Sequence, residues 1–76
     1  MTRDEPMSLH YYCLSFFDVR DNRATYSSAY CGLSAERVAH RDILEAKQAA
    51  KVSPTATLLA CTYLGYMTEA EFNFGV

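Results

Sequence analysis

The sequence lacks both an excess of basic residues and a long apolar run, and each absence argues against one class of partner. Seven lysine and arginine residues against nine acidic ones give a formal net charge of −2. Nucleic-acid binders usually carry a basic excess, because neutralising phosphates supplies much of their affinity. The longest apolar stretch, around residues 57–67, is interrupted by threonines and a glycine, whereas a membrane-spanning helix needs about 18 or more consecutive apolar residues. We therefore expect no membrane segment, and nucleic acid is not the favoured partner.

The spacings typical of metal and catalytic sites are also missing. Cys13, Cys31 and Cys61 form no C-x-x-C pair, and His10 and His40 are too far apart for an H-x₃-H pair. The three glycines do not form a phosphate-binding loop. A chain of 76 residues also offers little room for a substrate cleft. We therefore expect a protein that is not an enzyme and that has no metal and no cofactor.

The cysteines and the first residues predict a cytoplasmic protein. An odd number of cysteines does not suit the disulfide framework of a small secreted domain, so we interpret them as reduced structural residues. The opening residues, Met-Thr-Arg-Asp-Glu-Pro-Met, have mixed charge and no apolar core, unlike a secretory signal. We expect a flexible leader over residues 1–8 and a single small domain over 9–76.

Two strands are predicted in the first half of the chain. Residues 9–20 are rich in aromatic and β-branched side chains, and both alternating sets are largely apolar, which indicates a central strand. Asp21 and Asn22 favour a tight turn, since both residue types tolerate the left-handed conformation. Residues 24–31 follow as a more polar strand, which suits an edge position.

A helix and a third strand complete the pattern. Gly32 is expected to end the second strand, and Ser34 to cap a helix that carries Glu36 in its first turn and ends near residue 51 or 52. Apolar residues at helical spacing mark one face of this helix. Residues 55–67 predict the third strand, and the sequence from Thr68 to Glu71 has the spacing of a capping box that opens a short helical turn.

These elements predict an α+β fold with a ββαβ order. The most apolar strand belongs in the middle, so we expect a three-stranded, mainly antiparallel sheet in the order 2-1-3, with one helix packed on one face. A single helix covers a single face. Several Tyr, Leu or Phe side chains then remain on the other, and an exposed apolar patch above a few hundred Å² usually marks an interaction site.

This surplus of aromatic surface is the basis of the predicted function, a small non-enzymatic protein-interaction module. Tyrosine suits interfaces because it is apolar in body and polar at its tip. Homodimerisation is the first expectation, a lid formed by Phe72 and Phe74 is the second and needs no partner, and a different protein partner is the third. The residues predicted to contact a partner are Tyr12, Tyr26, Tyr30, Tyr63 and Tyr66.

The alternative function is single-stranded nucleic-acid binding. In that hypothesis Arg37 and Arg41 of the predicted helix contact phosphates while bases stack on the sheet tyrosines. Glu36, Asp42 and Glu45 lie on the same helix and offset most of its positive charge. A solvated helix face is therefore the more economical interpretation of these arginines.

The order of the apolar segments also carries a resemblance. The runs Tyr-Tyr-Cys-Leu-Ser-Phe from residue 11, Thr-Tyr-Ser-Ser-Ala-Tyr from residue 25 and Thr-Leu-Leu-Ala-Cys-Thr-Tyr-Leu from residue 57 follow the pattern hairpin, helix, strand. In this order the chain resembles short uncharacterised phage and prophage proteins. The resemblance covers most of the chain and implies a small accessory protein that acts by binding. It carries over no site residues.

Overall fold

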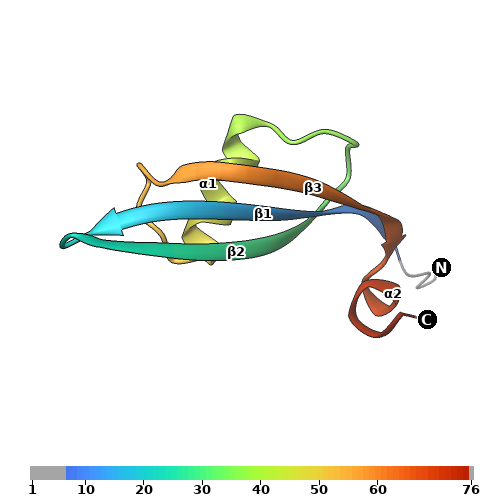
Figure 1. Cartoon of the computed structure of the whole chain (residues 1–76). Helices are drawn as coiled ribbons and strands as arrows, with labels where there is room; N and C mark the ends of the chain where they lie inside the picture. The colour runs from blue at the N-terminus through green and yellow to red at the C-terminus, as the bar shows by residue number, and fades with distance from the viewer. Residues whose placement is uncertain (1–6, 76) are drawn as a thin grey trace.

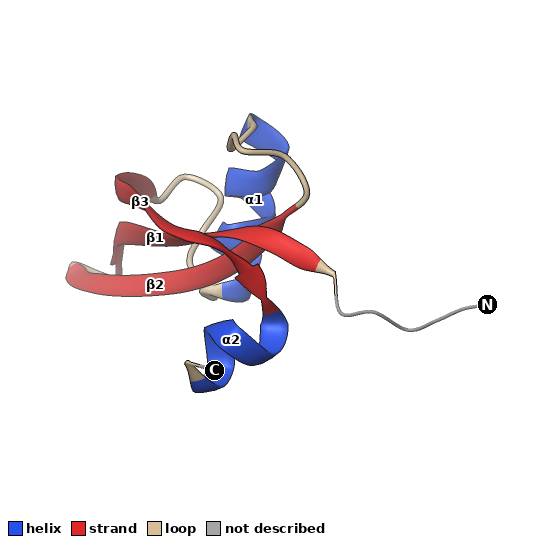
Figure 2. Cartoon of the chain, turned by 90° about the vertical axis from the view of Figure 1, so that its right-hand side faces the viewer, coloured by secondary structure: helices blue, strands red, loops and turns tan. Residues whose placement is uncertain are grey.

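The computed structural model describes residues 7–75, in which three strands and two helices follow one another along the chain. The elements are β1 (Ser8–Arg20), β2 (Arg23–Leu33), α1 (His40–Ala49), β3 (Thr57–Thr68) and α2 (Glu69–Phe74). The sheet is antiparallel and has the order β2-β1-β3, with α1 on one face (Figures 1 and 2). This confirms the predicted fold class. Of the predicted leader, residues 1–6 lie outside the described residues, and Ser8 already belongs to β1.

The β1–β2 hairpin turns where the sequence predicts it. Asp21 and Asn22 both have positive φ angles, 51° and 62°, and the flanking Arg20 and Arg23 are paired across the turn. Two consecutive left-handed residues define the turn whose twist matches that of the strands. This short loop sets the register of the whole hairpin, and therefore decides which side chains share a face.

The prediction that Ser34 caps the first helix is wrong. Strand β2 continues to Leu33, so the chain uses the next residues to pass from the sheet to the face where α1 lies. The helix begins at His40, and the Asp42 carboxylate accepts a hydrogen bond of 2.8 Å from the backbone N–H of Ala39. An anion in the first turn thus satisfies a free N–H group at the helix start.

The core lies between α1 and the sheet. Leu14 and Phe16 of β1 are completely buried there, and Ala46 is the buried residue of α1. The helix packs against β1 and β2 and makes no comparable contact with β3. Strand β3 is consequently exposed along most of its length.

Two bulges interrupt the pairing of β3 with β1. The register shifts place Leu59 and Leu64 as extra residues of β3, and Gly65 next to the second bulge has a φ of 136°. A bulge adds one residue to one strand and breaks the simple alternation of side chains. Tyr63 and Tyr66, which strict alternation separates, therefore lie on the same side of the sheet, opposite Tyr12 and His10 of β1.

Candidate protein-binding surface

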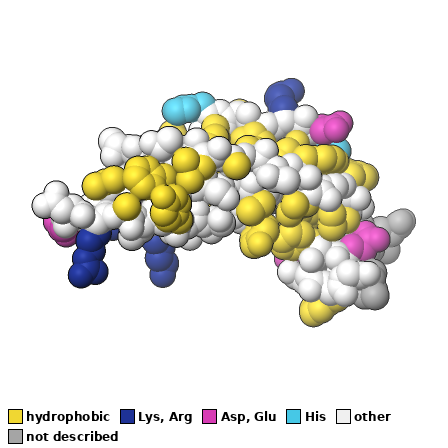
Figure 3. Space-filling view, in the orientation of Figure 1, with side chains coloured by type: hydrophobic (Ala, Val, Ile, Leu, Met, Phe, Trp, Pro, Cys, Tyr) yellow, Lys and Arg dark blue, Asp and Glu magenta, His cyan; other side chains and the backbone are white. Residues whose placement is uncertain are grey.

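The face of the sheet opposite α1 is called the open face here. Its β1 side chains alternate with those of the core. The β1 and β2 residues of this face are Tyr11, Cys13, Ser15, Phe17, Val19, Ala24, Tyr26, Ser28, Tyr30 and Gly32. Figure 3 looks onto the open face and shows its apolar side chains gathered in two patches with a polar region between them.

The first patch, called the tail patch, consists of Tyr11 and Tyr30 and is partly covered by Phe72 of α2. The Phe72 ring of α2 stacks on Tyr11, with centroids 4.3 Å apart and planes 7° apart, and meets Tyr30 edge-on at 5.5 Å. The Tyr11 ring also lies close to Gly32, where an added Cβ would come within 2.9 Å of it. The prediction that Gly32 ends the strand is wrong, because this residue lies within β2. Its missing side chain makes room for the ring.

The helix that carries Phe72 is held by a capping box. The Thr68 hydroxyl accepts a hydrogen bond from the N–H of Glu71 at 3.1 Å, and the Glu71 carboxylate accepts one from the N–H of Thr68 at 2.8 Å. This confirms the predicted short helical turn. Of the two residues predicted to form a lid, Phe72 packs on the sheet, whereas Phe74 does not and is 76% exposed.

The second patch, called the hairpin patch, consists of Phe17, Val19 and Tyr26. The rings of Phe17 and Tyr26 face each other at 5.3 Å across the β1–β2 pair. Tyr26 is 73% exposed and Val19 is 58% exposed, and no other element of residues 7–75 packs over them. This patch is therefore a part of the open face that no other described element covers.

A polar band separates the two patches. The hydroxyls of Ser15 and Ser28, which are paired across β1 and β2, hydrogen-bond to each other at 3.1 Å. On the β3 side, Ala60 is paired with Ser15 and Thr62 with Cys13. The open face is thus bipartite, with aromatic clusters at its two ends and small or hydroxylated side chains in the middle.

The five predicted contact tyrosines do not form one surface. Tyr26 and Tyr30 lie on the open face, one in each patch, and are both exposed. Tyr12 lies on the helix side in the core and is 7% exposed, and burial is the main cause that raises the pKa of its hydroxyl. Tyr63 and Tyr66 lie on the helix side of β3.

Tyr63 and Tyr66 belong to a second aromatic cluster, centred on His10. The His10 Nδ1 atom lies 2.9 Å from the Tyr63 hydroxyl, within hydrogen-bonding distance, and its ring centroid is 4.6 Å from that of Tyr66. Tyr12 approaches Tyr63 at 5.2 Å from the core side. This cluster links β1 with β3, while Tyr63 and Tyr66 stay partly exposed.

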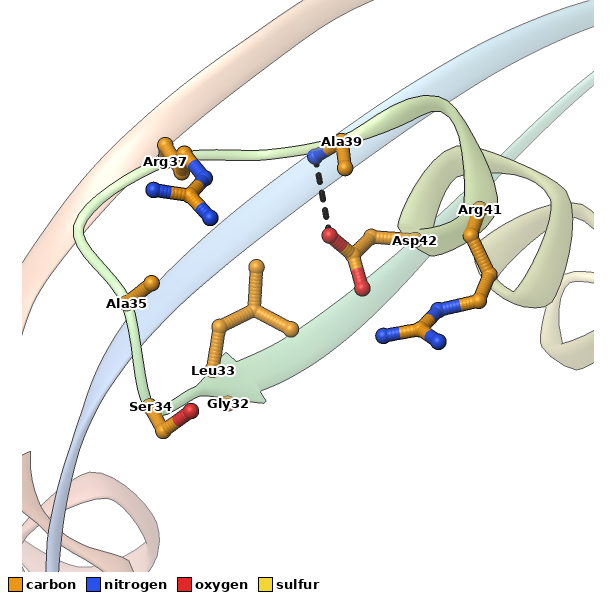
Figure 4. Close-up of a pocket in the computed structure, with 8 residues that line it drawn as sticks. All are labelled: Gly32, Leu33, Ser34, Ala35, Arg37, Ala39, Arg41 and Asp42. Atoms are coloured by element: carbon orange, nitrogen blue, oxygen red, sulfur yellow. Dashed lines mark hydrogen bonds between the residues drawn. The ribbon is translucent and has the colours of Figure 1, made fainter.

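The two arginines of the alternative function line a hollow on the other side of the sheet (Figure 4). Arg37 comes from the β2–α1 connection and Arg41 from the first turn of α1, and the Asp42 carboxylate lies between them. Tyr26 and Tyr30 project from the opposite face. The structure therefore does not bring the cationic groups and the open-face rings together.

The three cysteines lie in three different strands. All three are free thiols. Burial is the main cause that raises the pKa of Cys31 and that of Cys61. A raised pKa lowers the thiolate fraction, which is the nucleophilic form. Among residues 7–75 no group of three or more potential metal ligands is found. In the same range, no helix is both long enough and apolar enough to cross a membrane.

Asp18 is a buried charge that the sequence does not single out. Its carboxylate accepts hydrogen bonds from the N–H and the hydroxyl of Ser53, both at 2.9 Å, and from Arg20 Nε at 3.1 Å. The backbone hydrogen bond from Ser53 is the largest cause that lowers the pKa of Asp18, and the serine hydroxyl and Arg20 act in the same direction. Asp18 thus ties β1 to the connection between α1 and β3.

Phe17 and Val19 are the surface residues that sequence reasoning missed. The alternation of residues 9–20 places both in one set with Tyr11, but it does not determine which of the two sets the helix covers. The available signal is the two-residue turn at Asp21 and Asn22, because this turn pairs Phe17 with Tyr26 and so predicts a shared patch.

Comparison with known proteins adds no relative. No family model matches the chain, and neither the curated proteins nor the solved structures contain a significant match.

Proposed function

We propose that the protein is a small non-enzymatic protein-interaction module that binds a protein partner, or a second copy of itself, through the open face. In this proposal the hairpin patch provides the main contact and the tail patch frames it. Tyr26 and Tyr30 are the contact residues retained from the predicted set, and Phe17 and Val19 join them.

The observation that carries the proposal is the uncovered hairpin patch. Tyr26 and Val19 expose most of their surface on the paired strands β1 and β2. Each such apolar side chain gains about 1.5–3 kcal/mol on full burial, so a partner that covers several of them is stabilised. Tyrosine is enriched at interface centres because its ring loses little conformational entropy on binding. The polar band allows hydrogen bonds between the two apolar contacts.

Single-stranded nucleic-acid binding is not favoured by a specific observation. Arg37 and Arg41 lie on the helix side, away from Tyr26 and Tyr30. The overall charge of −2 also opposes binding to phosphates. A cytoplasmic location, in keeping with three free cysteines, is part of the proposal, and the phage-type resemblance stays a prediction.

The test compares the wild-type chain with the double variant Tyr26→Ser/Tyr30→Ser as immobilised baits. We expect the wild type to retain a protein that the variant does not, and a purified candidate to bind the wild type in calorimetry with at least about tenfold higher affinity. Far-UV circular dichroism checks that both baits are folded. The proposal is wrong if no bound protein distinguishes the two baits and the association state of the pure chain is also the same for both.

A further inference from the structure

Strand β3 is an edge strand whose two bulges are a partial protection, and it lacks the other usual protective features. It has 12 residues, it lies at the end of the sheet order, and no strand among residues 7–75 pairs with its outer side. From Thr57 to Thr68 it contains no charged residue and no proline. Natural edge strands are normally short or carry lysine, proline or a covering element, because their free N–H and C=O groups would otherwise pair with another chain.

The exposure of β3 differs from that of the other edge. Strand β2 begins with Arg23 and is covered on its helix side by α1, where Ala29 is buried. Strand β3 has no such cover from α1, and apolar side chains are exposed along it, among them Leu59 at 53% and Leu64 at 41%. Its unpaired edge is therefore both longer and more apolar than that of β2.

The two bulges leave a regular segment between them. Residues 60–63 pair with β1 without a register shift, whereas the extra residues Leu59 and Leu64 lie on either side. Bulges bend a strand and disrupt pairing locally. The segment 60–63 is thus the straight part of the β3 edge and the best centre for a new ladder of hydrogen bonds.

We propose that β3 pairs antiparallel with β3 of a second copy of this chain, which forms a continuous six-stranded sheet around a two-fold axis near Cys61 and Thr62. A two-fold axis normal to the sheet brings a strand beside itself in the antiparallel direction, which is the commonest symmetry of homodimers. The absence of charge on β3 means that self-pairing brings no like charges together. Every copy of the chain therefore supplies an uncharged β3 edge that can pair with another copy.

This pairing would also add stability to a domain that is small. A chain of this length forms a thin core and commonly needs a disulfide, a metal or oligomerisation for added stability. Pairing of β3 hydrogen-bonds its outer edge and covers part of Leu59 and Leu64 on the two copies. Both copies of α1 then lie on one side of the joined sheet, and both open faces lie on the other.

The proposal goes beyond the proposed function, because it uses the strand edge and leaves the hairpin patch free. The two binding modes are distinguished by two neighbouring residues. Cys61 lies on the helix side of β3 and Thr62 on the open side, and both are exposed. A lysine at either position places like charges across a β3–β3 pair, whereas a lysine at Cys61 does not reach the open face.

The experiment measures the solution mass of the full chain by light scattering over a concentration series, for the wild type, Cys61→Lys and Thr62→Lys. Thr25→Lys is the matched control, because Thr25 is an exposed threonine on the opposite edge strand. We expect a wild-type dimer, an unchanged dimer for Thr25→Lys, and a dimer dissociation constant raised about tenfold or more for both β3 variants. Tyr26→Ser/Tyr30→Ser should leave this dimer intact.

Four results overturn edge pairing. A wild-type chain that stays monomeric into the millimolar range removes it, and so does a dimer that tolerates both lysines. A dimer that is broken by Thr62→Lys and by the tyrosine double variant but tolerates Cys61→Lys assigns self-association to the open face, which overturns edge pairing and supports the proposed function. If a lysine variant loses its circular dichroism signal, amide hydrogen exchange of the wild type decides. Edge pairing requires β3 amides whose protection rises with concentration, and concentration-independent exchange overturns it.

Discussion

Phe16 and Phe17 are neighbours on β1 that have the same side chain and opposite surroundings. Phe16 points toward α1 and is completely buried, in contact with the core cluster around Leu14 and Ala46. Phe17 points to the open face, where its described aromatic contact is the exposed ring of Tyr26. The difference shows that the energetic role of an aromatic residue here depends on what covers its face of the sheet, and not on its strand or its residue type.

The largest expected effect breaks the covered side of this comparison. Phe16→Ala leaves a cavity in the core and should lower the free energy of unfolding by about 3–5 kcal/mol. The matched variant Phe17→Ala removes the same atoms from a partly exposed site and should cost about 1 kcal/mol. Urea unfolding followed by circular dichroism measures both. Equal losses in the two variants would contradict the assignment of the faces.

The second effect concerns the covered end of the open face. Gly32→Ala places a methyl group against the Tyr11 ring, on which Phe72 stacks, and overpacking of this kind typically costs about 1–3 kcal/mol. The control is a double-mutant cycle in which Gly32→Ala is repeated in the Tyr11→Ala background. There the cost of the alanine should largely disappear. A cost that persists without the ring would mean that the contact with Leu9, whose Cδ1 lies 3.0 Å from the added Cβ, and not the contact with Tyr11, is responsible.

The third effect compares the two phenylalanines of the C-terminal helix. Phe72→Ala removes the stack on Tyr11 and the edge contact with Tyr30 and should lower the free energy of unfolding by about 1–2 kcal/mol. Phe74→Ala changes an exposed side chain and should stay within about 0.5 kcal/mol of the wild type. Thermal or urea unfolding provides the measurement. A neutral Phe72→Ala would show that α2 does not cover the tail patch in solution.

The smallest expected effect is a change in the pH dependence of stability. The variant Asp18→Asn removes one titrating group and hardly changes the volume of the side chain. The pKa of Asp18 is lower in the folded chain than its ordinary value of 3.8, chiefly through the hydrogen bond from the Ser53 N–H. Its stabilisation is therefore complete above pH 3.8, shrinks as the pH falls past that value and is lost below the folded-state pKa. Asp18→Asn should flatten this part of the curve of unfolding free energy against pH. A variant curve parallel to the wild-type one would contradict it.

Much of the local structure could be predicted because its causes are local. The Asp21–Asn22 turn follows from two residues that tolerate positive φ angles, and the helical turn after Thr68 follows from the reciprocal hydrogen bonds of a capping box. The central place of β1 follows from its apolar residues on both faces.

The start of α1 and the bulges of β3 could not be predicted in the same way. Ser34 is a good cap by residue type, but β2 needs Leu33 for its pairing with β1, and the chain must then cross to the other face. The extra residues Leu59 and Leu64 are visible in the pairing with β1 and in no local pattern. These features depend on how long each strand stays paired, which is a property of two segments at once.

The candidate surface, too, could be predicted in part from the sequence and in part only from the tertiary structure. The order of strand and helix patterns in the sequence predicts the ββαβ fold. The surplus of tyrosine and the lack of metal-binding or catalytic motifs favour a binding protein. The tertiary structure decided that Tyr12 belongs to the core, that Phe72 covers Tyr11, and that Tyr26 stays exposed. The reason is physical. Residue type and alternation determine which side chains are stabilised by burial. The positions of α1 over one face and of α2 at one end of the other face determine which of them are buried.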